Sequence, residues 1–254
     1  MASSSQVRQS RREELEARRV AAAQKDRRNR ILLFSGGIIV VIVVVALAVW
    51  GVVSASTKGG TDTPPNANAA KNGIMLTTAD NSGVVEGVPT FEMFSDYNCS
   101  ACKSANLTLS AAMDQLVTNK QLNVVIHSMQ FEGSTSRDAA VAAACSDSQG
   151  VFTPFHNQLY INQSTSGFDS AMLRATIPAT VGLTGDQLTA YQTCFDSKAT
   201  GGFVDGEAAY ASKMKVGTTP TFYLDGEDVT TKLYNQKTGT YDPDLLRQLV
   251  NEKK

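Results

Sequence analysis

Hydrophobic residues are unevenly distributed along the 254-residue chain, and the most apolar stretch lies near the N-terminus. Residues 31–53, ILLFSGGIIVVIVVVALAVWGVV, contain no charged side chain. As an α-helix this stretch would be about 34 Å long, enough to cross the roughly 30 Å hydrocarbon core of a bilayer. The pattern therefore predicts one transmembrane helix over residues 31–53, with Trp50 as an interfacial anchor.

The segment that follows, residues 54–72, has no hydrophobic periodicity and is rich in Ser, Thr, Gly, Pro, Asn and Ala. Such a segment buries too little apolar surface to offset the entropy of ordering it, so it predicts a flexible linker. The remainder, residues 73–254, is long enough for one domain with a substantial hydrophobic core.

Within that domain the pattern changes from strand to helix around two cysteines. Residues 90–95 are aromatic and β-prone, which predicts a buried strand. After Cys99, apolar residues recur at helical spacing, at positions 101, 105, 109, 112, 113, 116 and 117. The order is strand, turn, Cys99-Ser-Ala-Cys102 and helix, so Cys99 is predicted to lie at a helix N-terminus. Two more strands are predicted, over residues 122–129 and from Pro220 onward.

The net charge of −1 conceals a separation of charge along the chain. Residues 1–30 carry nine basic and four acidic side chains, a net +5, whereas residues 54–254 carry 14 basic and 20 acidic ones, a net −6. Because basic segments beside a membrane span stay inside, residues 1–30 are predicted to be a cytoplasmic tail and residues 54–254 to lie outside. The alternative is a cleavable signal peptide ending near residues 54–56, but the apolar run exceeds the usual h-region. A membrane-anchored protein with no nucleic-acid partner is expected.

A cysteine at a helix N-terminus is distinctive because unpaired N–H groups and the helix dipole stabilise its thiolate. Cys99 is therefore the predicted nucleophile, and Cys102, one turn later and facing inward, the predicted resolving thiol. A zinc site is the competing interpretation of a C-x-x-C motif. Because Cys145 and Cys194 form no second C-x-x-C, and neither histidine has ligand spacing, no metal site and no cofactor is predicted.

Several motifs occur together in an order that resembles the DsbA-like branch of the thioredoxin superfamily. The resemblance covers roughly residues 74–252. Its motifs are Phe94-Ser-Asp-Tyr-x-Cys99-x-x-Cys102, Ala139-x-x-Ala-Ala-Ala-Cys145, Gln149-Gly-Val-Phe-x-x-Phe-His156-x-x-Leu159, Cys194-Phe-x-Ser197 and Val216-Gly-Thr-Thr-Pro220-Thr-Phe. The resemblance implies a thioredoxin-like α/β fold with a helical insertion over about residues 134–215. It also implies that Pro220 is a cis-proline packed against the active-site disulfide, and that Thr219 offers its backbone to an extended substrate peptide.

The two remaining cysteines fall within that expected insertion. In an oxidising compartment leftover cysteines tend to pair, so Cys145 and Cys194 are predicted to form a structural disulfide. Independent buried thiols, and a redox relay with the catalytic pair, are the alternatives. His156 lies among apolar residues at helical spacing and His127 ends a strand, so both are interpreted as packed residues.

The sequence departs from the DsbA pattern at three positions. Ser100-Ala101 stands between the cysteines where the strong oxidase of the family has Pro-His, which predicts a higher pKa of the nucleophile and a milder oxidant. Thr219, before the cis-proline, also occurs in disulfide isomerases of the superfamily. Met93 occupies the position of the buried acid that assists proton transfer in relatives, and Glu92 is on the opposite face. Asp96 is the nearest replacement, either as a proton relay or as a cap of the turn.

Together these features predict an extracytoplasmic thiol–disulfide oxidoreductase that oxidises unfolded or partly folded exported proteins through a Cys99–Cys102 disulfide. The resemblance implies a quinone-linked membrane reoxidase as its second partner. Two alternatives stay open. The same site could work as a disulfide reductase or isomerase, or the domain could be a non-catalytic binding module with a thioredoxin fold.

Overall fold

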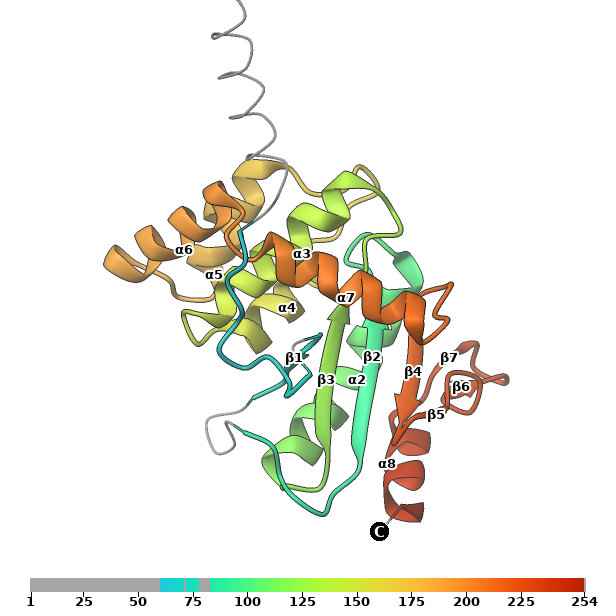
Figure 1. The fold of residues 1–254 in the computed structure, drawn as a ribbon. Coiled ribbons are helices and arrows are strands. Elements are labelled where there is room, and N and C mark those ends of the chain that lie inside the picture. The colour runs from blue at the N-terminus through green and yellow to red at the C-terminus, as the bar shows by residue number, and fades with distance from the viewer. Residues whose placement is uncertain (1–59, 71, 78–82, 254) are drawn as a thin grey trace, which may run out of the picture. The chain divides into compact units, whose positions relative to one another are not determined.

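The computed structural model describes residues 60–70, 72–77 and 83–253. A five-stranded mixed sheet forms the centre of this part, in the order β1-β3-β2-β4-β5 (Figure 1). β2 and β3 pair in parallel, whereas β1, β4 and β5 pair with their neighbours antiparallel. The strands are β1 (Ile74–Met75), β2 (Thr90–Ser95), β3 (Asn123–Ser128), β4 (Thr221–Leu224) and β5 (Glu227–Asp228).

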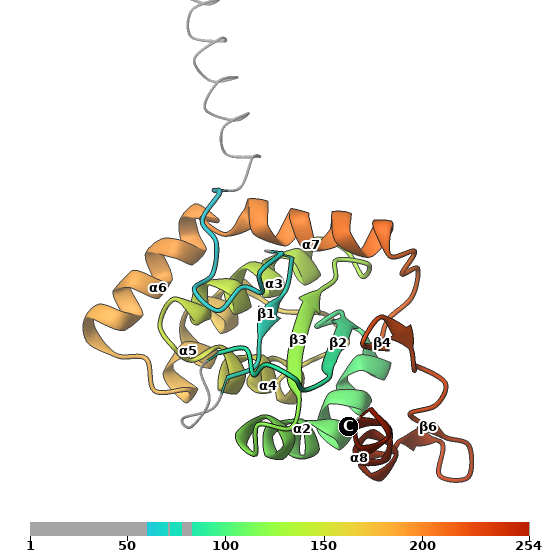
Figure 2. The same ribbon diagram turned by 60° about the horizontal axis from the view of Figure 1, so that its bottom comes forward.

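Helices cover both faces of this sheet. Helix α2 (Ser100–Thr118) connects β2 to β3 and packs on one face together with α8 (Pro243–Glu252). Helix α7 (Gly201–Lys213) crosses the opposite face, as the two views show (Figures 1 and 2). A small hairpin of β6 (Tyr234–Asn235) and β7 (Thr240–Tyr241) leads into α8 and contacts α2 through β7. The sheet is therefore the middle layer of three.

The alternation of side chains along β2 explains why both faces are covered. Phe91 and Met93 are fully buried in the main core cluster, which includes Leu109 and Met113 of α2. Phe94 belongs to a smaller cluster on the other face, with Ala211 of α7. Because successive residues of a strand point to opposite faces, a strand that is apolar at adjacent positions needs a helix on each side.

The chain between β3 and β4 is almost entirely helical, and its elements lie beside the carboxyl ends of the parallel strands β2 and β3 (Figure 1). Helix α3 is rich in alanine, and every residue from 139 to 147 is buried. Such small side chains let α4, α6 and α7 approach α3 closely. The elements are α3 (Ser134–Asp147), α4 (Phe152–Ile161), the π-helical turn η1 (Met172–Thr176), α5 (Ile177–Thr180), α6 (Gly185–Ser197) and α7.

The segment before β1 differs from the flexible linker that the sequence predicts for residues 54–72. Its described part lies against the domain: the N–H of Gly60 donates to the carbonyl oxygen of Lys198 at 2.8 Å. Asn66 donates its backbone and side-chain N–H groups to the Asp147 carboxylate at 2.7 and 2.8 Å. The expectation fails for these residues because hydrogen bonds to distant parts of the chain, which composition does not reveal, offset the entropy of ordering them.

No helix within residues 60–70, 72–77 and 83–253 has both the length and the apolar character needed to cross a bilayer. The predicted span over residues 31–53 and the basic tail over residues 1–30 lie outside the described residues. Both stay predictions from the sequence.

Candidate active site

Cys99 is the N-cap residue of α2 and follows the short turn after β2. Its backbone is extended (φ −77°, ψ 120°), and its Sγ accepts a hydrogen bond from the N–H of Cys102 at 3.4 Å. The Cys99 thiol donates in turn to the carbonyl oxygen of Thr219 at 3.5 Å. The sulfur thus lies between a helix N-terminus and the loop that precedes β4.

The two thiols of this motif have different environments and therefore different acidities. The exposed fraction of Cys99 is 9%, whereas Cys102 is fully buried. A hydrogen bond from the Cys102 thiol, together with the N–H groups of Cys102 and Ala101, lowers the pKa of Cys99 to about 6 although burial opposes this. Burial, and then the hydrogen bond with Cys99, raises the pKa of Cys102. In the reduced protein at neutral pH the negative charge therefore lies on the Cys99 sulfur.

The loop before β4 brings two more of the predicted residues to the cysteines. The peptide bond between Thr219 and Pro220 is cis, and the carbonyl group of Thr219 faces the Cys99 thiol. The structure therefore places Cys99, Cys102, Thr219 and Pro220 together, although they come from sequence positions about 120 residues apart. The binding of a substrate peptide by Thr219 stays a prediction.

Asp96 has the hydrogen bonds of a turn cap. Its Oδ1 accepts from the N–H of Asn98 at 2.8 Å, and its Oδ2 accepts from the N–H of Glu132 at 3.0 Å. The side chain is fully buried, and both of its oxygens are engaged by backbone groups. Of the two roles considered for Asp96, these contacts favour the cap over the proton relay.

Glu92 and Met93 occupy opposite faces of β2, as the alternation predicts. Met93 is fully buried in the core, while the Glu92 carboxylate lies 3.0 Å from Nε2 of His127 and accepts from the hydroxyl of Tyr210 at 3.2 Å. The hydrogen bond with His127 lowers the pKa of Glu92. His127 is fully buried and stacks on Phe94 with 4.3 Å between ring centroids, so its interpretation as a packed residue is confirmed.

A network of buried polar side chains lies under the active-site turn, and no sequence motif predicts it. The hydroxyl of Tyr97 lies 3.0 Å from Nδ1 of His156, and Nε2 of His156 lies 2.9 Å from Oδ1 of Asn106. An amide oxygen can only accept, so Nε2 carries the proton and Nδ1 accepts from Tyr97. Burial lowers the pKa of His156 to about 3, which keeps the ring neutral. His156 is thus a packed residue, as expected, and it also ties the turn to α2 and α4.

Glu207 of α7 is a second buried group that the sequence does not reveal. It is fully buried, and its Oε1 accepts from the N–H of Ser128 at 3.1 Å. Its Oε2 has no hydrogen-bond partner among the described residues. Burial raises the pKa of Glu207 well above the ordinary value and so favours the protonated carboxyl group. Helical spacing puts Glu207 on the same face of α7 as Phe203 and Ala211, and the packing of that face on the sheet buries the carboxyl group.

The second cysteine pair lies within the helical region. Cys145 of α3 and Cys194 of α6 form a disulfide with their Cα atoms 5.8 Å apart, whereas Cys99 and Cys102 are free thiols. Of the three states considered for Cys145 and Cys194, the structure contains the disulfide. The hydroxyl of Thr200, the N-cap residue of α7, lies 3.6 Å from the Cys145 sulfur.

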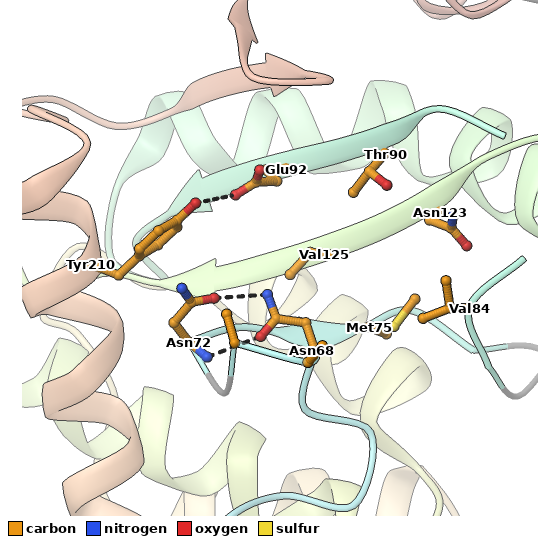
Figure 3. Close-up of a pocket in the computed structure, with 11 residues that line it drawn as sticks. Asn68, Asn72, Met75, Val84, Thr90, Glu92, Asn123, Val125 and Tyr210 are labelled. Atoms are coloured by element: carbon orange, nitrogen blue, oxygen red, sulfur yellow. Dashed lines mark hydrogen bonds between the residues drawn. The ribbon is translucent and has the colours of Figure 1, made fainter. Parts of the chain in front are cut away.

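A pocket of about 280 Å³ lies on the face of the sheet that α7 crosses (Figure 3). Its lining comes from the N-terminal segment, β2, β3 and α7, and includes none of the residues of the active-site turn. The hydrogen bond between Tyr210 and Glu92 spans its floor, and Asn68 and Asn72 pair at its rim. The described residues contain no group of three His, Cys, Asp or Glu side chains that could hold a metal ion.

Comparison with known proteins agrees with this site. A family model described as thioredoxin matches residues 80–240, and a search of curated proteins finds no match. The chain is similar in structure to MdbA, a thiol-disulfide oxidoreductase from Actinomyces oris (17% identity, TM-score 0.58, covering 78% of this chain and 94% of that chain). It is also similar to oxidised BdbD from Bacillus subtilis (17%, 0.56, 77% and 98%) and to the reduced disulfide bond oxidoreductase DsbG from Mycobacterium tuberculosis (16%, 0.55, 75% and 91%).

The family model covers more than half of the chain, so the protein belongs to the thioredoxin family. At the identities found, the structural likeness shows a shared fold, and this fold is the DsbA-like one. Membership of the thioredoxin family and the thioredoxin-like α/β fold are therefore confirmed, and the likeness to the DsbA-like branch is one of fold. The predicted class of enzyme, the thiol–disulfide oxidoreductases, agrees with the family and with the free C-x-x-C pair at the start of α2.

Proposed function

We propose that this protein oxidises the thiols of exported, incompletely folded proteins outside the cytoplasm, using a Cys99–Cys102 disulfide. The observation that carries the proposal is the asymmetry of this pair. Cys99 is partly accessible and has a pKa of about 6, whereas Cys102 is fully buried and has a raised pKa. Such a pair directs an incoming thiolate to one sulfur and retains the other as the leaving group.

The reaction begins with the oxidised form of the pair. A substrate thiolate attacks Sγ of Cys99, the Cys99–Cys102 bond breaks, and Cys102 leaves as a thiolate that takes up a proton. A second substrate thiolate then attacks the substrate sulfur of this mixed disulfide and expels the Cys99 thiolate. Two electrons pass from the substrate to the enzyme, which ends as the dithiol.

The acidity of Cys99 supports the oxidising direction. Stabilising the Cys99 thiolate stabilises the reduced enzyme, which makes its disulfide a better oxidant. A pKa of about 6 lies between the values of roughly 7 for thioredoxin and 3.5 for DsbA. This intermediate acidity supports the milder oxidant that is expected when no histidine stands between the cysteines.

The charge pattern supports the location that the proposal requires. An uncharged stretch over residues 31–53 would anchor the domain to the cell membrane, with the basic residues 1–30 in the cytoplasm and the catalytic domain outside. The enzyme would be reoxidised there by a membrane protein that passes electrons to quinone. An anchored domain meets both this partner and proteins emerging from the export machinery.

The same site also permits work as a disulfide reductase or isomerase, and the features that favour this second candidate are Thr219 before the cis-proline and the lack of a histidine between the cysteines. Equilibration of the full-length protein with a glutathione buffer separates the two. A reduction potential well above that of thioredoxin supports the oxidase, whereas a potential near roughly −270 mV supports the reductase.

The direct test of the proposal is the variant Cys102→Ser, expressed in full length in cells. Because a hydroxyl group in place of the Cys102 thiol cannot release the substrate from Cys99, mixed disulfides between this variant and exported proteins should accumulate. They should be visible as reducible high-mass species in non-reducing gels. The double variant Cys99→Ser, Cys102→Ser is the matched control and should form none. If neither variant traps any protein, the catalytic function is contradicted.

A further inference from the structure

The turn that carries Cys99 is held from outside by the side chain of Gln163, which follows α4. Its Nε2 donates to the carbonyl oxygen of Tyr97 at 2.6 Å and to that of Cys99 at 2.9 Å. Both hydrogens of the amide group are therefore used. Since the two carbonyl groups lie on either side of Asn98, one side chain fixes both ends of the turn that leads into α2.

The carbonyl group of Cys99 connects the hydrogen bonds of Gln163 to helix α2. It also accepts from the N–H of Lys103 at 3.1 Å, which is a hydrogen bond of the first turn of α2. The N–H of Cys102, which bonds to the Cys99 sulfur, belongs to the same turn. A change in the orientation of the Cys99 peptide group would therefore move the sulfur relative to both Cys102 and Thr219.

The hydrogen bonds of Gln163 belong to a larger set that connects the turn to neighbouring segments. Nζ of Lys103 donates to the carbonyl oxygen of Gln163 at 3.3 Å, so α2 and the loop after α4 bond to each other in both directions. Nδ2 of Asn98, the residue between the two clamped carbonyl groups, donates to Oγ1 of Thr135 at 2.7 Å and to Oγ of Ser136 at 3.0 Å. Helix α3 and the loop after α4 thus both bond to the turn, and Gln163 bonds to the nucleophilic residue itself.

We infer that Gln163 is a positioning residue for thiol–disulfide exchange. It holds the Cys99 peptide so that the sulfur lies at the N-terminus of α2, where the thiolate is stabilised, and opposite Thr219. The inference rests on the proposed function, and it makes the region between β3 and β4 part of the catalytic apparatus. The acidity of Cys99 then depends on a loop that lies about 60 residues away in sequence.

Two variants of the full-length chain test this inference. Gln163→Met keeps the volume of the side chain and removes both donors. Gln163→Glu places a carboxylate against two carbonyl oxygens at neutral pH, but its protonated form can donate one hydrogen bond. The matched control is Gln158→Ala, because Gln158 lies on α4 and accepts from Asn162 rather than from the turn.

Two measurements distinguish positioning from a purely structural role: the pH profile of iodoacetamide alkylation of reduced Cys99, and the oxidation rate of a reduced test protein. For Gln163→Met the alkylation midpoint should rise by about half a pH unit or more, and oxidation should slow roughly tenfold. For Gln163→Glu the deficit relative to the unchanged protein should shrink as the pH falls through the pKa of the new carboxyl group. Gln158→Ala should match the unchanged protein in both measurements.

The result that overturns the inference is an unchanged alkylation midpoint and oxidation rate in both Gln163 variants. If Gln163→Met does not fold, Gln163→Ala takes its place in both measurements, because it removes both donors without placing a charge near Cys99. Failure of the proposed function has a different signature, since Cys99→Ser would then keep the full oxidation rate whatever residue stands at position 163.

Discussion

The protein contains two cysteine pairs of opposite chemistry. Cys99 and Cys102 lie within one helical turn and are free, whereas Cys145 and Cys194 are 49 residues apart and are joined. Cys99 caps the N-terminus of α2, where the partial positive charge of the helix stabilises a thiolate. Cys145 lies in the last turn of α3, where the helix dipole has the opposite effect. The position of Cys99 at a helix N-terminus distinguishes the reactive pair from the joined one.

The largest expected difference between the pairs is in catalysis. Cys99→Ser should reduce the oxidation of a test protein to the uncatalysed rate, because the attacked sulfur is missing. The double variant Cys145→Ala, Cys194→Ala should keep most of the activity while it stays folded. Measuring both variants against the same reduced protein checks the contrast. Equal losses in the two would mean that the second pair takes part in the electron transfer.

For the free energy of unfolding, loss of the Cys145–Cys194 pair should have a larger effect than loss of Cys99. The Cys145–Cys194 disulfide closes a loop of about 50 residues, so its removal should lower the free energy of unfolding by about 4 kcal/mol in the loop-entropy model. Urea unfolding of the double alanine variant and of the unchanged protein measures this loss. At pH 6, where the Cys99 thiolate contributes little, Cys99→Ser serves as the control against the protein with a reduced active site and should shift the free energy by less than about 1 kcal/mol. A loss of similar size in both variants would remove the distinction.

The response to pH should also separate the pairs. The folded pKa of the Cys99 thiol is lowered from 9.0 to about 6, so the thiolate stabilises the reduced protein fully above pH 9. This contribution is lost as the pH falls toward 6, at up to about 1.4 kcal/mol per pH unit. Urea unfolding of the reduced protein between pH 5 and 9 should show a rise in stability, relative to Cys99→Ser, over this window. The disulfide-bonded cysteines do not titrate and add no slope.

The smallest expected effect concerns the turn that distinguishes the reactive pair. Asp96→Asn keeps one acceptor oxygen and places an NH2 group, which can only donate, against the second backbone N–H, so it should lower the free energy of unfolding by about 1–3 kcal/mol and leave the oxidation rate within about twofold. Urea unfolding and the pH profile of oxidation check the two parts. A rate that falls tenfold with an altered pH profile would instead assign Asp96 to proton transfer.

The reactive pair could be recognised from the sequence because its signals are local. A β-prone run, a turn and an apolar repeat at helical spacing place Cys99 at a helix start without any knowledge of the rest of the fold. Recognition of Thr219 and Pro220 needed the resemblance to a family, since a Thr-Pro before a strand is ordinary by itself. The order of the motifs along the chain assigned Thr219 and Pro220 to the active site, which their spacing from the cysteines alone could not do.

The features that the sequence did not reveal depend on contacts between distant segments. Gln163 stands in a polar stretch without periodicity, and its two partners lie 64 and 66 residues earlier. The burial of Glu207 arises from the crossing of α7 over the sheet. Residues 60–70 have the composition of a linker, yet they are held by Lys198 and Asp147, which the chain reaches much later. The local sequence pattern does not indicate partners that lie far away along the chain.

The buried disulfide has a consequence for how each copy of the protein matures. Cys145 has no exposed surface in the finished fold, so its bond to Cys194 has to form while α3 and α6 are still open to an oxidant. A newly made copy is then itself a thiol-bearing, incompletely folded chain of the kind that the mature protein is proposed to oxidise. Mature molecules would promote the maturation of later ones, and the first copies in a cell would depend on another source of oxidising equivalents.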